Sequence, residues 1–448
     1  MTKEPEWDEI ALEYMSRPNA IAEAIDYEKN LIVSYIGNMP RAYPPMYLAQ
    51  ALCVEQSTGT FIPVPAETPE TRRKHVARVI GVYSLPDYEY NEWIPKEENK
   101  FRRVFVQIAY PMNFTPQIPM MFSTIYGNIA LAGPLKMVDV RFPKAFLEGF
   151  KGPKFGDMGI RKILGVPERP LLNNMIKPCV YTDPKVGAEL AYEAAVGGAD
   201  IIKDDELLSD TDFNPTIDRV VAFMEALDRA DSEKGEKTLY TVNITDRIKK
   251  MFDLADSVQE HGGNALMVNY IAVGYSAVRE LAEDPSIKIP ILGHMDFAGT
   301  LYNDPWSGIS SPIVLGKLGR LVGCDTIVFP APYGKAITPK DKYLEITRQM
   351  VMPFGHIKRT LPMPSGGITP GIIDKIIADL GNNIMIGSGG GIHAHPDGAI
   401  AGAKAFRQAI DAVMKGIPIK QAAKDEKNRE LGVSMGLFGS SKTTFTSV

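Results

Sequence analysis

The chain has 448 residues, of which 45% are hydrophobic and 23% are charged, and its formal net charge is -5. This length exceeds one ordinary domain core, so we expect at least two domains. The composition is typical of folded globular proteins, and the acidic charge balance argues against the basic surface of nucleic-acid-binding proteins.

The cysteines and the N-terminus indicate a reducing compartment. Cys53, Cys179 and Cys324 are too few and too widely spaced for a disulfide framework or a thiolate zinc site. The stretch MTKEPEWDEIALEYMSRP lacks the apolar core of a signal peptide, and no apolar run reaches the roughly 18 residues of a membrane span. We therefore expect a cytoplasmic protein that binds neither nucleic acid nor membrane.

The first third of the chain predicts a small α+β domain. After an N-terminal extension over residues 1–29, residues 30–145 contain strand-like runs interleaved with helical segments such as PPMYLAQALCVEQS. The strand-like runs are NLIVSYIG, HVARVIGVYSL and RRVFVQIAYP. The Gly- and Pro-rich residues 146–169 are interpreted as a linker.

Residues 170–415 predict a closed barrel, because strand-like runs followed by helical stretches recur eight times. The runs are LLNNMIKP, ADIIKDD, TLYTVNIT, ALMVNY, IPILGHMD, DTIVFPAP, TLPMPSGG and NIMIGSGGG. Eight strand–helix units favour a (β/α)8 TIM barrel over an open doubly wound sheet. Residues 416–448 are expected to form a C-terminal helical segment and a mobile tail.

Reactive side chains follow most of the predicted strands, where TIM barrels carry their active sites. They are Lys177, Lys203, Asp205, Glu206, Asn243, Asn269, His294, Lys335 and Ser365. His294 is a candidate acid/base or ligand of a substrate hydroxyl. Lys335 lies in APYGKAIT, either on a loop that closes over substrate or as an ordinary solvated lysine.

The run IIKDDE at the second strand predicts a cation site. Strand alternation places Lys203 and Asp205 on one face and Glu206 at the exit, and it directs Asp204 elsewhere. Two carboxylates suit Mg2+, which an ammonium would repel. Addition of CO2 to Lys203 would turn it into a third anionic oxygen ligand. The alternative is a Lys203–Asp205 salt bridge inside the barrel.

Glycine runs after the last two strands predict a phosphate site. PSGGITPG contains Gly366 and Gly367, and GSGGGIHAHPDG contains Gly389 and Gly390. Loops at these positions frequently bind phosphate through backbone N–H groups, although glycines also serve tight turns. His393 and His395 either orient the phosphate or cap the next helix. A cation, a phosphate and one or two bases suit proton removal beside a carbonyl, with stabilisation of the enediolate.

Several motifs together resemble a known family. GGADIIKDDELLSD, NMIKP, GHMDFAG, PSGGI and GSGGGIHAHPDG resemble, in order and spacing, the large subunit of ribulose bisphosphate carboxylase (RuBisCO), and more closely its RuBisCO-like relatives. CVEQSTGTF is similar to that family's Glu-Ser-Ser-Thr-Gly-Thr-Trp stretch. The resemblance covers about residues 30 to 415.

The resemblance implies roles for individual residues. Lys203 would be carbamylated and would bind Mg2+ together with Asp205 and Glu206. Lys177 would transfer protons, His294 would contact the substrate and Lys335 would be the mobile-loop lysine. The substrate and its phosphate would be held by Ser365, Gly366, Gly367, Gly389 and Gly390. Glu55 and Thr60 would complete the active site of a partner subunit, which implies a homodimer or a higher oligomer.

Departures from the family's pattern argue against CO2 fixation. Cys179 replaces the second lysine of Lys-Pro-Lys, and Met295 replaces a phosphate-binding arginine. Met120 stands where an asparagine is expected, and the histidine before the mobile loop is absent from IVFPAPYGK. One of the family's two phosphate-binding sites is therefore missing, which favours a substrate with a single phosphate.

The sequence thus predicts a Mg2+-dependent RuBisCO-like enzyme that enolises a singly phosphorylated ketose or 3-oxo sugar acid. The outcome would be isomerisation, tautomerisation, decarboxylation or C–C cleavage. One alternative is the 2,3-diketo-5-methylthiopentyl-1-phosphate enolase of methionine salvage, whose lysine base aligns with Asn128. Retention of Lys335, which that branch tends to lose, suits a substrate carboxylate. A true carboxylase and a catalytically silent binding protein are the remaining alternatives.

Overall fold

The structure is a computed structural model, and it describes residues 18–59, 62, 64–85, 101–115, 117–131, 133–335 and 338–440. The chain divides into two units. One comprises Met1–Phe150 with Gly299–Val314, and the other comprises Lys151–Ala298 with Leu315–Val448. Thr60, a predicted substrate contact, lies outside the described residues. Within the described ranges, no helix has the length and apolar character that crossing a membrane requires.

The N-terminal unit is built on a five-stranded sheet in the order β10-β4-β1-β3-β2. Its long strands pair antiparallel: β1 (Asn30–Pro40), β2 (Arg78–Leu85), β3 (Phe101–Pro111) and β4 (Leu135–Arg141). The helices are α2 (Pro45–Glu55), α3 (Pro69–His75), α4 (Ile118–Tyr126) and α5 (Lys144–Glu148). The predicted α+β architecture is confirmed, and the three strand-like runs correspond to β1, β2 and β3.

The segment Gly299–Val314 belongs to this unit, although the sequence pattern places it inside the barrel. Its two-residue strand β10 (Gly308–Ile309) pairs parallel with β4. The Gly308 N–H donates to the Tyr126 hydroxyl at 2.8 Å, and Lys136 Nζ donates to the Tyr302 carbonyl at 2.7 Å. A strand this short leaves no periodic pattern, so the sequence alone gives no sign of it.

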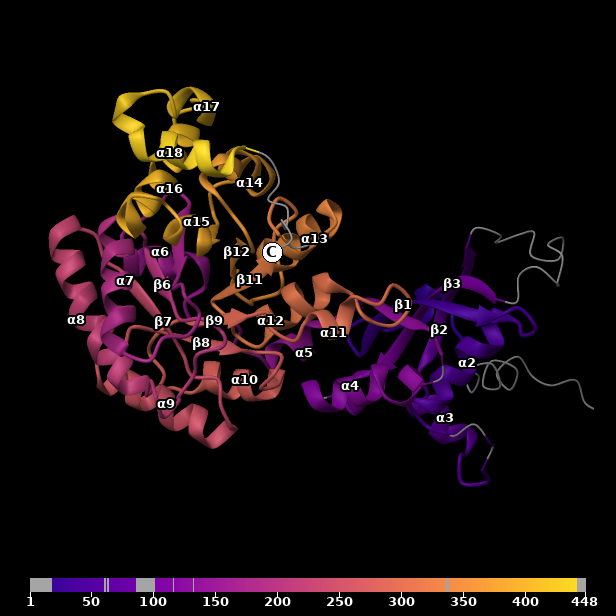
Figure 1. Cartoon of the computed structure of the whole chain (residues 1–448). Helices are drawn as coiled ribbons and strands as arrows, with labels where there is room; N and C mark the ends of the chain where they lie inside the picture. The colour runs from indigo at the N-terminus through magenta and orange to yellow at the C-terminus, as the bar shows by residue number, and fades with distance from the viewer. Residues whose placement is uncertain are drawn as a thin grey trace, which may run out of the picture. The chain divides into compact units, whose positions relative to one another are not determined.

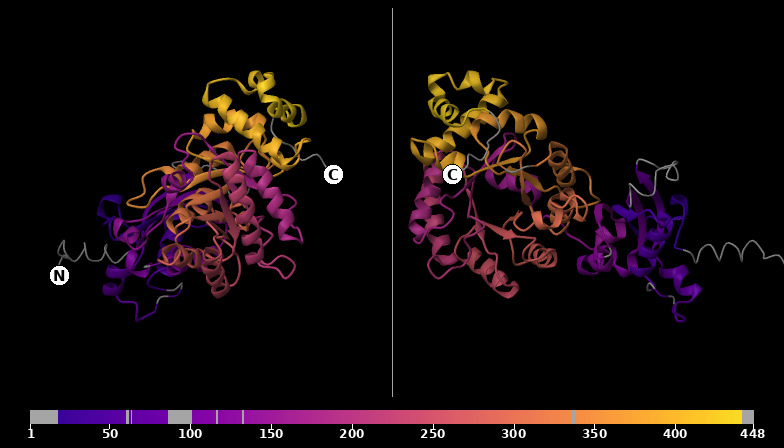
Figure 2. Two further views of the ribbon diagram at one scale, coloured as in Figure 1. Left: turned by 90° about the vertical axis from the view of Figure 1, so that its left-hand side faces the viewer. Right: turned by 45° about the vertical axis from the view of Figure 1, so that its right-hand side comes forward.

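The second unit is an eight-stranded parallel barrel, as predicted. Its strands are β5 (Leu171–Met175), β6 (Ile201–Lys203), β7 (Leu239–Asn243), β8 (Ala265–Asn269), β9 (Ile291–His294), β11 (Thr326–Pro330), β12 (Leu361–Ser365) and β13 (Met385–Ser388). Crossover helices lie outside the strands (Figures 1 and 2). They include α7 (Pro184–Val196), α8 (Thr216–Lys234), α9 (Ile248–Glu260), α10 (Tyr275–Glu283), α13 (Lys340–Val351), α14 (Ile373–Leu380) and α16 (Gly398–Met414).

The amino-terminal end of the barrel is filled by one apolar cluster. Leu171, Ile201, Leu239, Leu292, Val328, Leu361 and Met385 come from seven different strands and are all buried. Each side chain of this kind stabilises the fold by about 1.5–3 kcal/mol when fully buried. This end is therefore a packed core, which leaves the opposite, carboxyl ends of the strands for chemistry.

Residues 146–169 contain more structure than the expected linker. Helix α6 (Gly156–Leu164) lies in this segment, and its Ile160 and Leu164 join the apolar cluster of the barrel. The two residues are four positions apart and so share one face of the helix. The Gly and Pro residues around α6 masked this short amphipathic pattern in the sequence.

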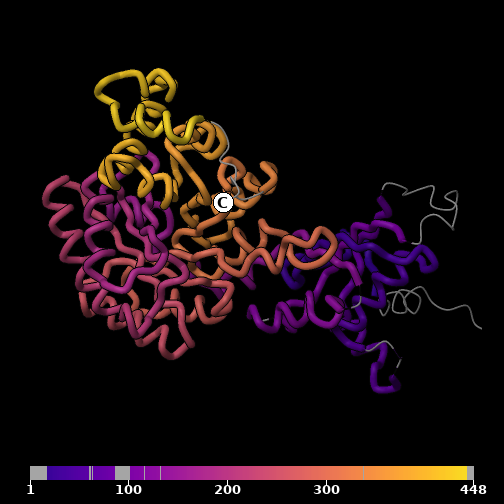
Figure 3. Tube along the Cα trace, in the orientation of Figure 1, coloured from indigo at the N-terminus to yellow at the C-terminus, as the bar shows by residue number. Residues whose placement is uncertain are grey.

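Strands β12 and β13 stand at the two ends of the hydrogen-bonded strand order, and the packing between them depends on Gly387. No residue pairing joins β12 to β13 in the described barrel. A Cβ on Gly387 would lie 2.7 Å from Met363 Cε and 3.1 Å from Ser365 Oγ. The two strands therefore meet where these β12 side chains pack against the backbone of Gly387. At the end of the described chain, α17 (Ile419–Ala422) and α18 (Arg429–Phe438) pack on α16 (Figure 3).

Candidate active site

Lys203 ends β6 and is fully buried inside the barrel. Its Nζ donates to Glu206 Oε2 at 3.0 Å and to the Asp204 carbonyl oxygen at 2.6 Å. Burial would raise the pKa of Glu206, but the charge and the hydrogen bond of Lys203 outweigh this effect and help to lower it to about 2. Glu206 is therefore an anion at neutral pH, and Lys203 is its partner.

Asp204 points to the other face of the strand, as predicted. Its carboxylate accepts from Arg219 of α8 at 3.1 Å, and both side chains are fully buried. The Tyr240 hydroxyl at 2.7 Å and the Asn243 N–H at 2.9 Å complete its hydrogen bonds. Every oxygen of Asp204 is satisfied from within the fold, so this acid is structural.

Lys177 pairs with Asp205, which corrects the predicted alternative of a Lys203–Asp205 salt bridge. Lys177 Nζ lies 2.6 Å from Asp205 Oδ2 and 2.9 Å from Cys179 Sγ. Burial would lower the pKa of Lys177, but the hydrogen bonds and charge of Asp205 outweigh it and raise the pKa. The lysine after β5 and the lysine of β6 therefore each neutralise one of the two predicted metal-binding carboxylates.

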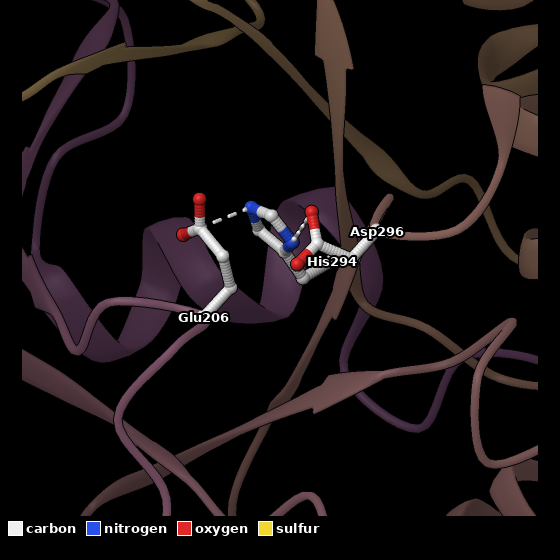
Figure 4. A group of neighbouring side chains, drawn as sticks. All are labelled: Glu206, His294 and Asp296. Atoms are coloured by element: carbon white, nitrogen blue, oxygen red, sulfur yellow. Dashed lines mark ion pairs between the residues drawn. The ribbon is translucent and has the colours of Figure 1, made fainter. Parts of the chain in front are cut away.

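His294 at the end of β9 lies between two carboxylates (Figure 4). Its Nε2 is 3.4 Å from Glu206 Oε2, and its Nδ1 is 3.6 Å from Asp296 Oδ1. The side chain is 2% exposed, and burial together with the charge of Lys203 lowers the pKa of His294 to about 3. The imidazole is therefore neutral at physiological pH.

Asp296 is the functional candidate that the sequence analysis missed. Burial, reinforced by the charge of Glu206, raises the pKa of its carboxyl group. The signal was present in GHMD, because Asp296 follows His294 by two positions, the spacing that placed Lys203 beside Asp205.

Two amides support the turn after β6. Asn243 Nδ2 donates to the carbonyl oxygens of Asp205 and Glu206, each at 3.3 Å, and Asn269 Nδ2 donates to that of Glu206 at 3.4 Å. Asn269 Oδ1 is buried and has no hydrogen-bond partner among the described atoms. Such an orphaned acceptor at a strand end indicates space for a ligand.

The glycine loops after β12 and β13 face open space in part. A Cβ added to Gly366 or Gly390 would meet no atom within 4 Å, whereas one on Gly389 would lie 3.1 Å from Lys177 Cε. The Lys335 N–H donates to the Gly366 carbonyl at 2.7 Å, so the exposed Lys335 is tied by its backbone to this loop. Ser365 ends β12 and is buried.

The other candidates have separate environments. His395 is a capping residue, because its Nδ1 accepts from the Asp397 N–H and its Nε2 contacts the Glu430 carbonyl, both at 3.1 Å. His393 Nε2 is buried without a partner in the described ranges. Glu55 ends α2 in the N-terminal unit, where it lines a largely apolar pocket of about 590 Å3. Its proposed contact with substrate therefore stays a prediction.

Comparison with known protein families identifies the chain. Residues 158–438 match the ribulose bisphosphate carboxylase large chain, catalytic domain, and residues 23–146 match the N-terminal domain of the same chain. The chain belongs to the RuBisCO large-chain family. The resemblance seen in the sequence motifs is thereby confirmed.

Individual relatives point to the RuBisCO-like branch. A ribulose bisphosphate carboxylase-like protein of Archaeoglobus fulgidus is 54% identical, with 92% of this chain and 94% of that protein covered. A 2,3-diketo-5-methylthiopentyl-1-phosphate enolase of Geobacillus kaustophilus is 36% identical, with 85% and 92% covered. This protein is thus a RuBisCO-like family member with relatives named as enzymes.

Solved structures agree with this assignment. The rubisco-like protein MtnW of Alicyclobacillus acidocaldarius superposes with a TM-score of 0.83 at 31% identity, covering 92% of this chain and 99% of that one. A dimeric archaeal RuBisCO of Hyperthermus butylicus superposes with a TM-score of 0.84 at 30% identity, covering 95% and 100%. The fold of this RuBisCO-like protein is therefore that of the whole large chain.

Proposed function

We propose that this RuBisCO-like protein is a Mg2+-dependent enzyme that enolises a singly phosphorylated ketose or 3-oxo sugar acid without fixing CO2. Isomerisation, tautomerisation, decarboxylation or C–C cleavage would follow. The observation that carries the proposal is the end of β6, where Asp205 and Glu206 are each held by a lysine at 2.6 and 3.0 Å.

The donor set fits Mg2+. Asp205 and Glu206 supply the carboxylate oxygens that this hard cation prefers, and the orphaned Asn269 Oδ1 lies at the end of β8, two strands along the barrel. Neutral Lys203 and CO2 would form a carbamate with release of one proton, which adds a third anionic oxygen. Mg2+ bound there would supply a Lewis acid that polarises a substrate carbonyl.

Lys177 is the better candidate of the two lysines for moving the substrate proton. Its side chain is 33% exposed, whereas that of Lys203 is fully buried. Gly389 packs against the Lys177 side chain, so a phosphate bound at the glycine loop would bring its substrate close to Nζ. A lysine paired with Asp205 holds its proton, so Lys177 can act as a base only after the pair opens and this proton is released.

The structure supports a single phosphate-binding site. The glycine loops offer backbone N–H groups beside open space at Gly366 and Gly390. Met295, at the position where the carboxylase pattern has its arginine, is partly buried and packs against the apolar barrel cluster. An apolar side chain there offers a second phosphate no charge, which favours a substrate other than a bisphosphate.

Enolisation of 2,3-diketo-5-methylthiopentyl 1-phosphate is the second candidate. It is favoured by the relatives that carry this activity in their names, at 34–36% identity over more than four fifths of the chain. A homodimer that shares its active site is proposed with both candidates. It is supported by the dimeric archaeal RuBisCO neighbour.

Solvent exchange tests the proposal. We expect a screen of phosphorylated sugar acids and the diketo phosphate in D2O to give Mg2+- and bicarbonate-dependent deuterium incorporation. Lys203→Ala should abolish it, and Lys177→Met should slow it about 10²- to 10⁴-fold, the usual contribution of a proton-transfer group. Lys185→Ala, on the exposed surface of α7, is the control. Full exchange in Lys203→Ala would overturn the proposal.

A further inference from the structure

The ring of His294 is buried at the mouth of the barrel. It is 2% exposed, and its two nitrogens face two different carboxylates (Figure 4). Nδ1 is buried and has no hydrogen-bond partner within the described ranges, since 3.6 Å to Asp296 exceeds hydrogen-bonding distance. A buried imidazole with an unsatisfied nitrogen requires an explanation.

Glu206, His294 and Asp296 each offer one ligand atom, and these three atoms lie within 4.8 Å of one another. The lone pairs of Nδ1 and Nε2 point in diverging directions, and each carboxylate lies on the side of a different nitrogen. Glu206 is the carboxylate that pairs with Nε2, and Asp296 is the one that pairs with Nδ1. The geometry therefore divides the cluster into direct ligands and an outer partner.

We propose that a divalent transition-metal ion binds between Glu206 Oε2 and His294 Nε2, and that Asp296 then moves from 3.6 Å to hydrogen-bonding distance and accepts the hydrogen of Nδ1. The two ligand atoms are 3.4 Å apart, which suits a shared ion with bonds of about 2.1 Å. A carboxylate on the second nitrogen is the usual companion of a metal-binding histidine, because it fixes the tautomer and the ring orientation.

The backbone around Asp296 supports a functional turn. Phe297 adopts φ +71°, a conformation that a bulky side chain rarely takes. Such strain is retained where the surrounding structure requires a particular direction of the chain. Here the strained residue directly follows the carboxylate that faces Nδ1.

The donor set selects the class of ion. An imidazole nitrogen with a carboxylate favours Mn2+, Fe2+, Co2+ or Zn2+ over Mg2+. The transition-metal site shares one ligand, Glu206, with the Mg2+ site of the proposed function, and it rests on that function in no other way. It needs no carbamate, because Lys203 is not a ligand. Lys203 Nζ instead lies 3.0 Å from the same Glu206 oxygen and competes with the ion for it.

Pulsed EPR of the full chain with Mn2+ alone, in CO2-free buffer, tests the inference. We expect nitrogen hyperfine coupling from a coordinated imidazole in the parent protein and its loss in His294→Gln. His393→Gln is the matched control, because it removes another barrel histidine with a buried ring nitrogen and should leave the coupling unchanged. Asp296→Asn should weaken Mn2+ binding about 10- to 100-fold in calorimetry.

Lys203→Met separates this site from the carbamate-dependent one. We expect this variant to bind Mn2+ without CO2 at least as tightly as the parent, because the competing ammonium is gone. Loss of Mn2+ binding in Lys203→Met, or bound Mn2+ without nitrogen coupling, would overturn the inference. Neither result depends on deuterium exchange, so failure of this site and failure of the proposed reaction are distinguishable.

Discussion

The two faces of the β6 strand end carry the same kinds of residue and behave differently. On the outer face, Asp204 and Arg219 are fully buried, and two further donors satisfy the carboxylate. On the inner face, Lys203 and Lys177 hold Glu206 and Asp205, while Asn269 Oδ1 and His294 Nδ1 stay without partners among the described residues. A carboxylate whose hydrogen bonds are all made within the fold has a structural role. Buried polar atoms without a hydrogen-bond partner, beside open space, indicate a ligand site.

Breaking the outer pair should have the largest effect on stability. Arg219→Met would leave Asp204 as a buried carboxylate without its cation, at a cost of about 3–5 kcal/mol in the free energy of unfolding. Chemical denaturation measures this cost. Lys203→Met is the comparison on the inner face, where a smaller loss is expected because Glu206 is partly exposed. Equal losses in the two variants would contradict the distinction between the faces.

The sequence predicted the barrel and the face of each side chain, but not their partners. Eight apolar runs gave the strands, and alternation separated Asp204 from Asp205. Alternation cannot tell which of two ammonium groups reaches a carboxylate, because Lys177 arrives from a different strand after a turn. The match of Lys177 to Asp205 and of Lys203 to Glu206 therefore required the structure.

The pairing of strands that lie far apart in the chain also could not be predicted from the sequence. Gly299–Val314 leaves the barrel region of the chain and joins the N-terminal sheet through β10, whose partner β4 lies far away in sequence. Asp296 was missed for a different reason. A single acid two positions after His294 is a weaker sign of a site than the row of acids that follows Lys203.

Two glycines of the last strand and its loop sharpen the comparison further. Gly387→Ala would place a Cβ 2.7 Å from Met363 Cε, and we expect a loss of about 1 kcal/mol, the low end for overpacking, because this terminal methyl group can shift. Gly390→Ala meets no atom within 4 Å and should leave the melting temperature unchanged. It should nevertheless weaken binding of inorganic phosphate, measured by calorimetry, if this loop holds the phosphate. Unchanged phosphate binding in Gly390→Ala would exclude this loop as the grip.

The smallest expected effect concerns His393, whose buried Nε2 has no partner in the described barrel. Burial, with a contribution from the charge of Lys177, lowers the pKa of His393 to about 4 from an ordinary value of 6.5. Below pH 6.5 the unfolded chain binds a proton at this residue that the folded chain does not, so stability falls as the pH drops from 6.5 to about 4. Denaturation at several pH values should therefore show that His393→Gln removes about 1–2 kcal/mol of this loss, less than the full shift because the ring is partly exposed.

His261→Gln, at the exposed end of α9, is the control. An unchanged pH dependence in His393→Gln would mean that the buried nitrogen gains a partner in solution, as the carboxylate of Asp204 does within the fold.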